Sequence, residues 1–99
     1  MNNIIIELKV KNHPGVLSQV SGLFARRAFN LEGILCSGIG DKTESIILLL
    51  VNNDDRISQI VKQLEKLYDV CEVLVKEEYS QDAFSSLYTN LAEHYNRIS

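Results

Sequence analysis

Residues 3–17 read Asn-Ile-Ile-Ile-Glu-Leu-Lys-Val-Lys-Asn-His-Pro-Gly-Val-Leu, and this stretch decides the fold. Ile4, Ile6, Leu8 and Val10 alternate with other residues and share one face, which predicts a β-strand over residues 3–10. Pro14 then interrupts the strand, and its fixed φ suits the first position of a helix. Gly15 permits close approach of another backbone. The stretch therefore predicts a strand that leads through a short loop into a helix.

The rest of the chain repeats this alternation of strands and helices. The first helix should cover residues 15–28, because Val16, Leu17, Val20, Leu23 and Phe24 fall in one apolar arc. Further strands are expected at 29–39, 45–52 and 70–77, with a second helix at about 57–68. Residues 46–51 are all apolar, which indicates a strand buried on both faces. The order βαββαβ predicts an α+β, ferredoxin-like fold, in which a four-stranded antiparallel sheet carries two helices on one face.

This plan leaves one face of the sheet without helices. That face should be polar, yet Ile5, half of the run 46–51 and Leu74 are expected on it, so we expect something to cover it. Residues 82–97 form an amphipathic helical pattern, and we divide the chain into a domain at 1–78 and a helical tail at 79–99. The tail has two possible roles: packing on its own sheet or a twin subunit, or docking a different protein.

Composition excludes several classes of partner. The 99 residues carry a formal net charge of −3, whereas nucleic-acid and membrane-surface binding favour a basic face. No apolar run approaches the roughly 20 residues that span a bilayer. The N-terminus lacks the basic and apolar segments of a signal peptide, so we expect a cytoplasmic protein.

The cysteines and histidines give no metal-binding pattern. Cys36 and Cys71 are the only cysteines and lie in strand-like apolar runs, so free thiols in the core or the sheet are expected. There is no CxxC sequence, and His13 and His94 lack ligand-like spacing. We expect neither a metal nor any other cofactor in this chain.

Catalytic motifs are equally scarce. The sequence has no P-loop, G-x-S-x-G or G-x-G-x-x-G. An acylphosphatase-like hydrolase would need an arginine in the loop 11–15, and an RNA-recognition domain would need aromatic residues on its central strands. A copper chaperone would need CxxC in the same loop. A small hydrolase is therefore a weak hypothesis, and binding of a small molecule at the end of the first strand is the hypothesis that we keep.

The loop after the first strand has the groups that an amino acid needs. Backbone N–H groups at a helix N-terminus suit a carboxylate, and the Asn12 amide can both donate and accept. His13 either binds the ligand or has a structural role. Asn30 opens the second strand; if that strand is a sheet edge, it can pair with its counterpart in a second chain. A ligand lodged there would contact both chains.

Two segments carry a family resemblance. Lys-Asn-His-Pro-Gly-Val-Leu at 11–17 and Gly-Leu-Phe-Ala-Arg-Arg-Ala-Phe-Asn-Leu-Glu-Gly-Ile-Leu-Cys at 22–36 closely resemble small, regulatory subunits of acetolactate (acetohydroxyacid) synthase. The resemblance covers about residues 4–77 and is nearest to the short form of the valine-sensitive isozyme I type. The family fold is the ACT domain.

The resemblance implies a regulatory role without catalysis. It implies a homodimer, formed through the second strand and first helix, that binds a branched-chain amino acid, chiefly valine, at its interface. It also implies a large catalytic subunit that carries thiamine diphosphate, Mg²⁺ and FAD and is activated and feedback-inhibited through this chain. The alternative is a stand-alone amino-acid-binding scaffold. The effector-binding residues expected are Asn12, His13, Pro14, Gly15, Val16, Leu17, Asn30 and Leu31.

Overall fold

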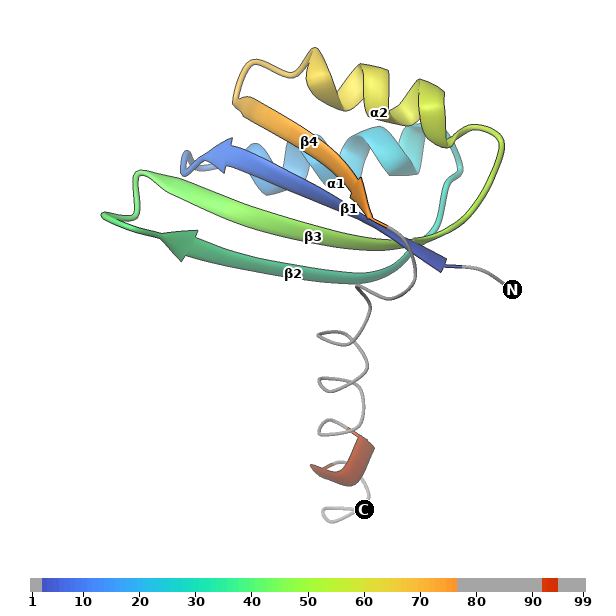
Figure 1. The fold of residues 1–99 in the computed structure, drawn as a ribbon, viewed down its shortest axis with the longest axis horizontal. Coiled ribbons are helices and arrows are strands. Elements are labelled where there is room, and N and C mark those ends of the chain that lie inside the picture. Colours follow the sequence, from blue (N-terminus) through green and yellow to red (C-terminus); the bar gives the residue numbers. More distant parts are fainter. Residues whose placement is uncertain (1–2, 77–91, 95–99) are drawn as a thin grey trace.

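The computed structural model describes residues 3–76 and 92–94. Its elements follow the predicted order (Figure 1): β1 (Asn3–Lys11), α1 (Val16–Arg26), β2 (Leu31–Ile39), β3 (Glu44–Asn52), α2 (Ile57–Glu65) and β4 (Val70–Lys76). The predicted α+β class and the βαββαβ order are confirmed.

The four strands form one sheet in the order β2-β3-β1-β4, and every neighbouring pair is antiparallel. Both helices cover the same face of this sheet (Figure 1). The central strands are β1 and β3, and the edge strands are β2 and β4. This is the predicted ferredoxin-like arrangement.

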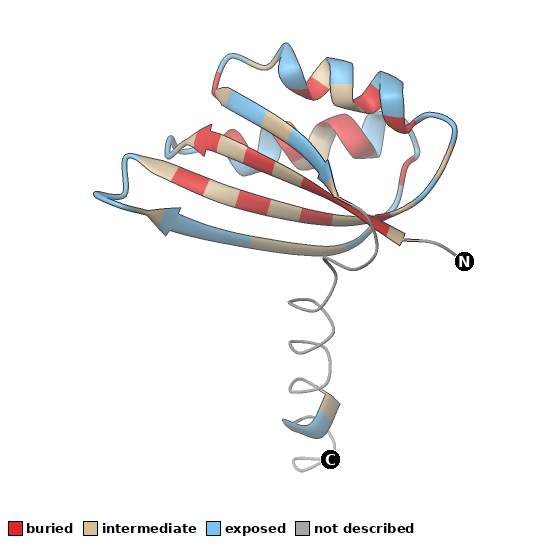
Figure 2. Cartoon of the chain, in the orientation of Figure 1, coloured by how far each residue is buried: buried red, intermediate tan, exposed pale blue. Residues whose placement is uncertain are grey.

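The core lies between the sheet and the two helices. It is built from the inward residues of β1 and β3 and the apolar stripes of α1 and α2, including Ile6, Leu8, Val20, Phe24, Ile47, Leu49, Ile60 and Leu64. Figure 2 shows the alternation of buried and half-buried residues along β3. The prediction that residues 46–51 are buried on both faces of the sheet is therefore wrong within one chain. Ile47, Leu49 and Val51 are buried, but the residues that alternate with them are only half-buried.

The first helix begins later than predicted. Gly15 has φ 88°, in the left-handed region, so it stands outside the helix as its N-cap and α1 begins at Val16. Pro14 consequently lies in the turn before the helix and not at its first position. Gly15 is needed here for its backbone conformation, because an added Cβ would meet nothing within 4 Å.

The end of α1 is closed by a Schellman motif. The Phe29 N–H donates to the Phe24 carbonyl at 2.9 Å, and the Ala28 N–H donates to the Ala25 carbonyl at 3.1 Å. The rings of Phe24 and Phe29 pack edge to face with centroids 5.8 Å apart, which adds the apolar contact typical of this motif. Ala28 occupies the left-handed position with φ 53°, where glycine is usual. The helix therefore ends at Arg26, two residues before the predicted end.

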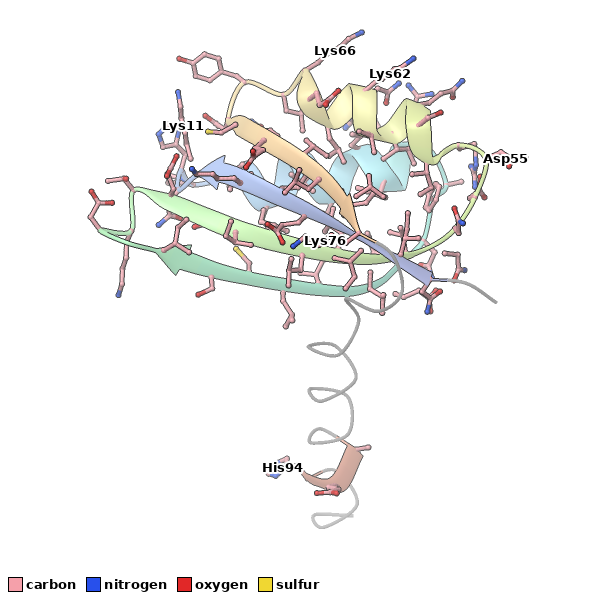
Figure 3. All side chains as sticks on the ribbon, viewed as in Figure 1. Lys11, Asp55, Lys62, Lys66, Lys76 and His94 are labelled. Carbon is pink, nitrogen blue, oxygen red and sulfur yellow. The ribbon has the colours of Figure 1, made fainter. Side chains whose placement is uncertain are left out.

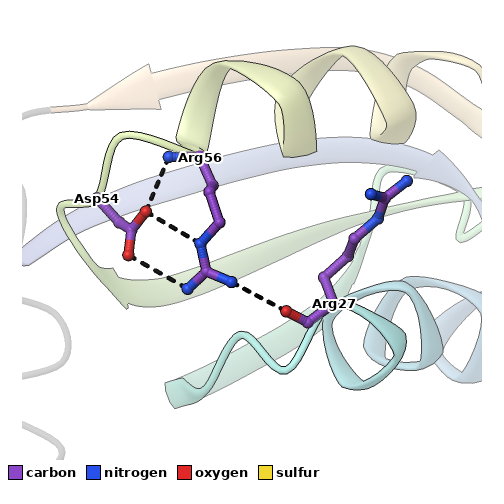
Figure 4. A network of polar contacts seen from close by, with 3 residues as sticks. All are labelled: Arg27, Asp54 and Arg56. Atoms are coloured by element: carbon purple, nitrogen blue, oxygen red, sulfur yellow. Dashed lines mark hydrogen bonds and ion pairs between the residues drawn. The ribbon is translucent and has the colours of Figure 1, made fainter.

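A polar network joins the end of α1 to the start of α2 (Figure 4). The Asp54 carboxylate accepts the Arg56 backbone N–H at 2.8 Å and pairs with the guanidinium at 3.1 and 3.2 Å. The same guanidinium donates to the Arg27 carbonyl at 3.0 Å. These hydrogen bonds from Arg56 hold the pKa of Asp54 below its usual value.

The face of the sheet opposite the helices is apolar in its centre. Ile46, Leu48 and Leu50 of β3 are half-buried there, and Leu74 of β4 is 42% exposed. Ile5 on the same face is buried. The predicted tail helix at 82–97, proposed as a cover for this face, falls outside the described residues except for 92–94, which are helical.

Polar pairs border this apolar centre. Glu7 of β1 pairs with Lys76 at 2.9 Å, and Lys9 pairs with Glu44 at 3.7 Å. Lys76 is labelled in Figure 3. The charges of Glu7 and Lys9 are therefore paired across neighbouring strands.

Of the two placements expected for the cysteines, in the core or in the sheet, the structure shows the sheet. Cys36 on β2 and Cys71 on β4 are exposed. The reason is topological, because β2 and β4 are the edge strands and have no buried residue in the single chain.

Candidate functional site

The loop between β1 and α1 is fixed to the β2–β3 hairpin through Asn12. The Asn12 side-chain amide donates to the Lys42 carbonyl at 2.9 Å, and its backbone N–H donates to the Thr43 carbonyl at 2.9 Å. Asn12 is exposed, and no described residue donates to its side-chain oxygen. One N–H of this amide is therefore occupied, while its acceptor oxygen is available to a ligand.

The hairpin presents the carbonyl that holds Asn12. Lys42 has φ 70°, and its N–H donates to the Ile39 carbonyl at 2.8 Å. The Asp41 carboxylate accepts from the hydroxyl of Thr43 at 2.8 Å and from its N–H at 3.1 Å, and these bonds lower the pKa of Asp41. The turn is thus closed by its own contacts, and the Lys42 carbonyl points to the loop of Asn12.

The start of α1 leaves backbone donors unsatisfied. The Val16 N–H makes a long bond of 3.3 Å to the His13 carbonyl, but within residues 3–76 no carbonyl accepts from the N–H of Leu17 or Ser18. Among the described residues, no side chain caps the helix. Exposed N–H groups at a helix N-terminus, with the positive end of the helix dipole, favour an anion such as a carboxylate.

The two apolar residues expected in this segment differ in exposure. Val16 is buried in the core, whereas Leu17 is 39% exposed. Leu17 was predicted to share the apolar arc of the helix, but only the other members of that arc are buried. Its side chain is available for contact with an apolar group outside the chain.

His13 contacts the turn that follows α2. Its Nδ1 lies 3.1 Å from the carboxylate of Asp69, whose side chain is largely buried. The Lys11 N–H also donates to the Asp69 carbonyl at 2.8 Å. Of the two roles considered for His13, the structural one is supported by this contact within the chain.

Asn30 and Leu31 lie at the opposite end of the sheet. Leu31 pairs with Val51, whereas Asn12 follows β1 at the end where Lys11 pairs with Glu44. Since β2 spans nine residues, its ends are roughly 26 Å apart at about 3.3 Å per residue. One chain therefore does not bring the two predicted halves of the site together.

The environment of this second half is simple. The Asn30 amide donates to the Glu32 carboxylate at 3.0 Å, and Leu31 packs against the core. The strand between the two ends is an edge strand without a buried residue, as Figure 2 shows. Its outer side is available for pairing with another strand.

Other kinds of site find no support in the described residues. Residues 3–76 and 92–94 contain no group of three or more His, Cys, Asp or Glu side chains placed to hold a metal ion. In the same part of the chain, no helix has the length and apolar character to cross a membrane. The Lys62 and Lys66 side chains project from the outer side of α2 (Figure 3).

Sequence comparison identifies the family. The family described as "AHAS small subunit-like ACT domain" matches residues 6–72. The chain belongs to this family. Because the ACT domain of these subunits is a regulatory module and not a catalytic one, the chain has a regulatory role. The resemblance expected from the loop 11–17 and the segment 22–36 is confirmed.

Its relatives include short and long proteins. The chain is 58% identical over 72 residues to "Acetolactate synthase isozyme 1 small subunit" of Escherichia coli K12, covering 73% of this chain and 75% of that protein. It is 43% identical over 70 residues to "Probable acetolactate synthase small subunit" of Methanothermobacter thermautotrophicus, covering 70% of this chain and 42% of that one. The expected nearness to the short isozyme form is therefore confirmed.

Solved structures agree with the fold. The crystal structure of the acetolactate synthase small subunit from Thermotoga maritima matches with 36% identity and a TM-score of 0.68, over 76% of this chain and 47% of that one. The regulatory subunit of aspartate kinase from Thermus thermophilus matches with a TM-score of 0.63 at 19% identity, over 76% of this chain and 50% of that one. At that identity the second likeness concerns the fold alone.

Two contacts of this region were missed by sequence reasoning. The sequence Gly40-Asp41-Lys42 indicates a turn, but it gives no sign that the Lys42 carbonyl holds Asn12. Asp69 was not singled out, yet it contacts His13. The only available signal was an acidic residue in a turn before an apolar strand, which is too common to identify a contact.

Proposed function

We propose that this chain is the regulatory subunit of an acetolactate synthase and binds valine where two copies meet. The observation that carries this proposal is the loop that leads into α1, where Asn12 has a side-chain oxygen that accepts from no described residue and the first N–H groups of the helix donate to no described carbonyl. These are the donor and acceptor that a free amino acid needs. The similarity to the Escherichia coli isozyme 1 small subunit supports the choice of enzyme.

Different groups of the loop and of the start of α1 would bind the carboxylate, the ammonium and the side chain of valine. The carboxylate of valine would accept from the N–H groups of Leu17 and Ser18, at the positive end of the α1 dipole. Its ammonium would donate to the side-chain oxygen of Asn12, whose amide group is held in orientation by Lys42. The exposed side chain of Leu17 offers an apolar contact to the isopropyl group.

A second copy completes the site. Two β2 edges that pair antiparallel about a two-fold axis reverse the direction of the strand. The pairing therefore carries Asn30 and Leu31 of one copy to the end of the sheet where Asn12 of the other lies. Residues that lie at opposite ends of the sheet in one chain, separated by the roughly 26 Å length of β2, would then form one site.

Regulation follows from linkage between this site and a catalytic partner. The partner would be the large subunit, which carries thiamine diphosphate, Mg²⁺ and FAD, and the two would act together in the cytoplasm. Valine is a product of the pathway that acetolactate begins. If valine binds the inhibited state more tightly than the active state, it shifts the complex toward inhibition by that difference in affinity.

A mixed dimer tests the shared site. One chain carries Asn12→Ala and the other Asn30→Ala, with different affinity tags so that only the mixed dimer is purified. A site shared between chains leaves one of the two sites intact, because the normal Asn12 of one chain meets the normal Asn30 of the other.

Isothermal titration with valine then counts the sites. We expect each homodimeric variant to bind at least tenfold more weakly than the unmodified chain. The mixed dimer should show one site per dimer at the unmodified affinity. Weak binding at both sites of the mixed dimer would place both asparagines in the same chain's site and overturn the proposal of a shared one.

A further inference from the structure

Asp69 is a buried acid that the fold itself does not require. It is 8% exposed, and Ser45 is the other buried polar residue among those described. Its carboxylate oxygen Oδ1 lies 3.1 Å from His13 Nδ1, but no group among residues 3–76 and 92–94 donates a hydrogen bond to it. Burying a carboxylate with so little compensation is unfavourable for folding.

The turn around Asp69 closes without this carboxylate. The Leu67 N–H donates to the Leu64 carbonyl at 3.1 Å, and the Val70 N–H donates to the Leu67 carbonyl at 3.1 Å. These bonds connect α2 to β4 through the backbone alone. The polar contacts of Asp69 go instead to the loop after β1, through its carbonyl to the Lys11 N–H and through its carboxylate to His13.

The loop is therefore held at two points. On one side Asn12 is bonded to the hairpin at Lys42, and on the other His13 is held by Asp69. Along the chain His13 lies between Asn12 and the start of α1, and its carbonyl accepts from the Val16 N–H at 3.3 Å. Its position sets the spacing between the two groups that the ammonium and the carboxylate of an amino acid would contact.

We propose that Asp69 is a positioning residue for effector binding, which acts by holding His13 and through it the loop between β1 and α1. The inference rests on the proposed function, because it assigns Asp69 to the same amino-acid site. Asp69 itself does not contact the ligand. The side chain of His13 is 55% exposed, so the pair is not a core contact whose removal must unfold the protein.

Substitutions at both partners separate positioning from a structural role. Asp69→Ala removes the acceptor, and Asp69→Asn keeps an acceptor oxygen but removes the charge. His13→Gln removes the imidazole on the exposed side of the pair. Asp55→Ala, at an exposed acid labelled in Figure 3, is the matched control.

Valine affinity of the full-length chain is the first measurement. We expect Asp69→Ala to raise the Kd for valine about tenfold and Asp69→Asn to raise it less. In the His13→Gln background, Asp69→Ala should add less than twofold, because the partner through which it acts is already absent. A general structural defect would instead weaken binding by the same factor in both backgrounds. The control should bind as the unmodified chain does.

Nitrogen NMR of His13 is the second measurement. The negative carboxylate oxygen lies 3.1 Å from Nδ1, and this proximity favours the imidazole form with a proton on Nδ1. This signature should be present in the unmodified chain and lost in Asp69→Ala. If the unmodified chain binds valine and Asp69→Ala binds it with the same affinity, the inference about Asp69 is overturned but the proposed function is not. Absence of valine binding by the unmodified chain, with or without a catalytic subunit, would overturn the proposed function and the inference with it.

Discussion

A negative charge introduced at residue 15 gives the sharpest test of where the effector carboxylate lies. Gly15 precedes the unsatisfied N–H groups of α1, and an added Cβ meets nothing within 4 Å. Both Gly15→Asp and Gly15→Asn therefore have room. They have nearly the same shape and are the residues that best tolerate a φ of 88°. Gly15→Asn is thus the matched control, and the two variants differ in one negative charge.

The magnitude follows from Coulomb's law. Two like charges about 4 Å apart repel by about 1 kcal/mol in water and about 4 kcal/mol near a protein surface. The Kd for valine should therefore be roughly fivefold to several-hundredfold higher in Gly15→Asp than in Gly15→Asn. The loss cannot come from unfolding, because an acidic residue before α1 interacts favourably with the helix dipole.

Isothermal titration at low and high salt measures this difference. The gap between the two variants should narrow at high salt, because mobile ions screen exposed charges. Thermal unfolding should show Gly15→Asp at least as stable as Gly15→Asn. Equal valine affinity of the two variants at low salt would refute the placement of the carboxylate at the start of α1.

Three further predictions concern the fold that supports this site. Ala28→Gly should raise the unfolding free energy by about 1 kcal/mol and the Tm by roughly 4 to 8 °C, because glycine relieves the left-handed strain at φ 53°; an unchanged Tm in a thermal scan would contradict this. Urea unfolding should show that Leu49→Ala, at a fully buried residue, costs about 2 to 5 kcal/mol. The half-buried Leu48→Ala should cost clearly less, and equal losses would show that the helix-free face is as well covered as the core. Hydrogen bonds with Arg56 lower the pKa of Asp54 in the folded state. The folding stability that Asp54 contributes is therefore present above its unfolded-state pKa and disappears as the pH falls through its folded-state pKa. Asp54→Asn should therefore lose less stability than the unmodified chain on acidification below about pH 4, and parallel acid curves would argue against it.

The element order was predictable because its signals are local. Alternation along β1 and helical spacing along α1 and α2 depend on a few neighbouring residues. The ends of α1 were less predictable, because the residues next to them do not by themselves require one backbone conformation. Gly15 permits a left-handed conformation without requiring one, and Ala28 takes one that its sequence does not favour. Both ends of α1 were therefore predicted within two residues of their positions.

The contacts of the site were less accessible to sequence reasoning. The first loop was recognised as a binding segment because a strand, Pro14 and a helix start follow one another directly. The bond of Asn12 to Lys42 and the pairing of His13 with Asp69 join distant parts of the chain. No local pattern encodes which carbonyl or carboxylate the fold brings near.

Burial also depends on contacts between distant parts of the chain, because the strand order and the placement of the helices decide which residues are covered. Cys36 resembles a core residue in its apolar run, but the strand order places it on an edge. The run 46–51 resembles a strand buried on both faces, but both helices lie on one face. Sequence patterns report which side chains are apolar, whereas topology decides which of them are covered within one chain.

Acetolactate production by a purified catalytic subunit tests the central claim most directly. We predict that adding this chain raises the rate and that valine then lowers it in a saturable way. The Asn12→Ala chain should still raise the rate but leave it insensitive to valine at the concentration that inhibits the unmodified complex. A rate that this chain does not change, or equal inhibition by valine in both complexes, would contradict the account.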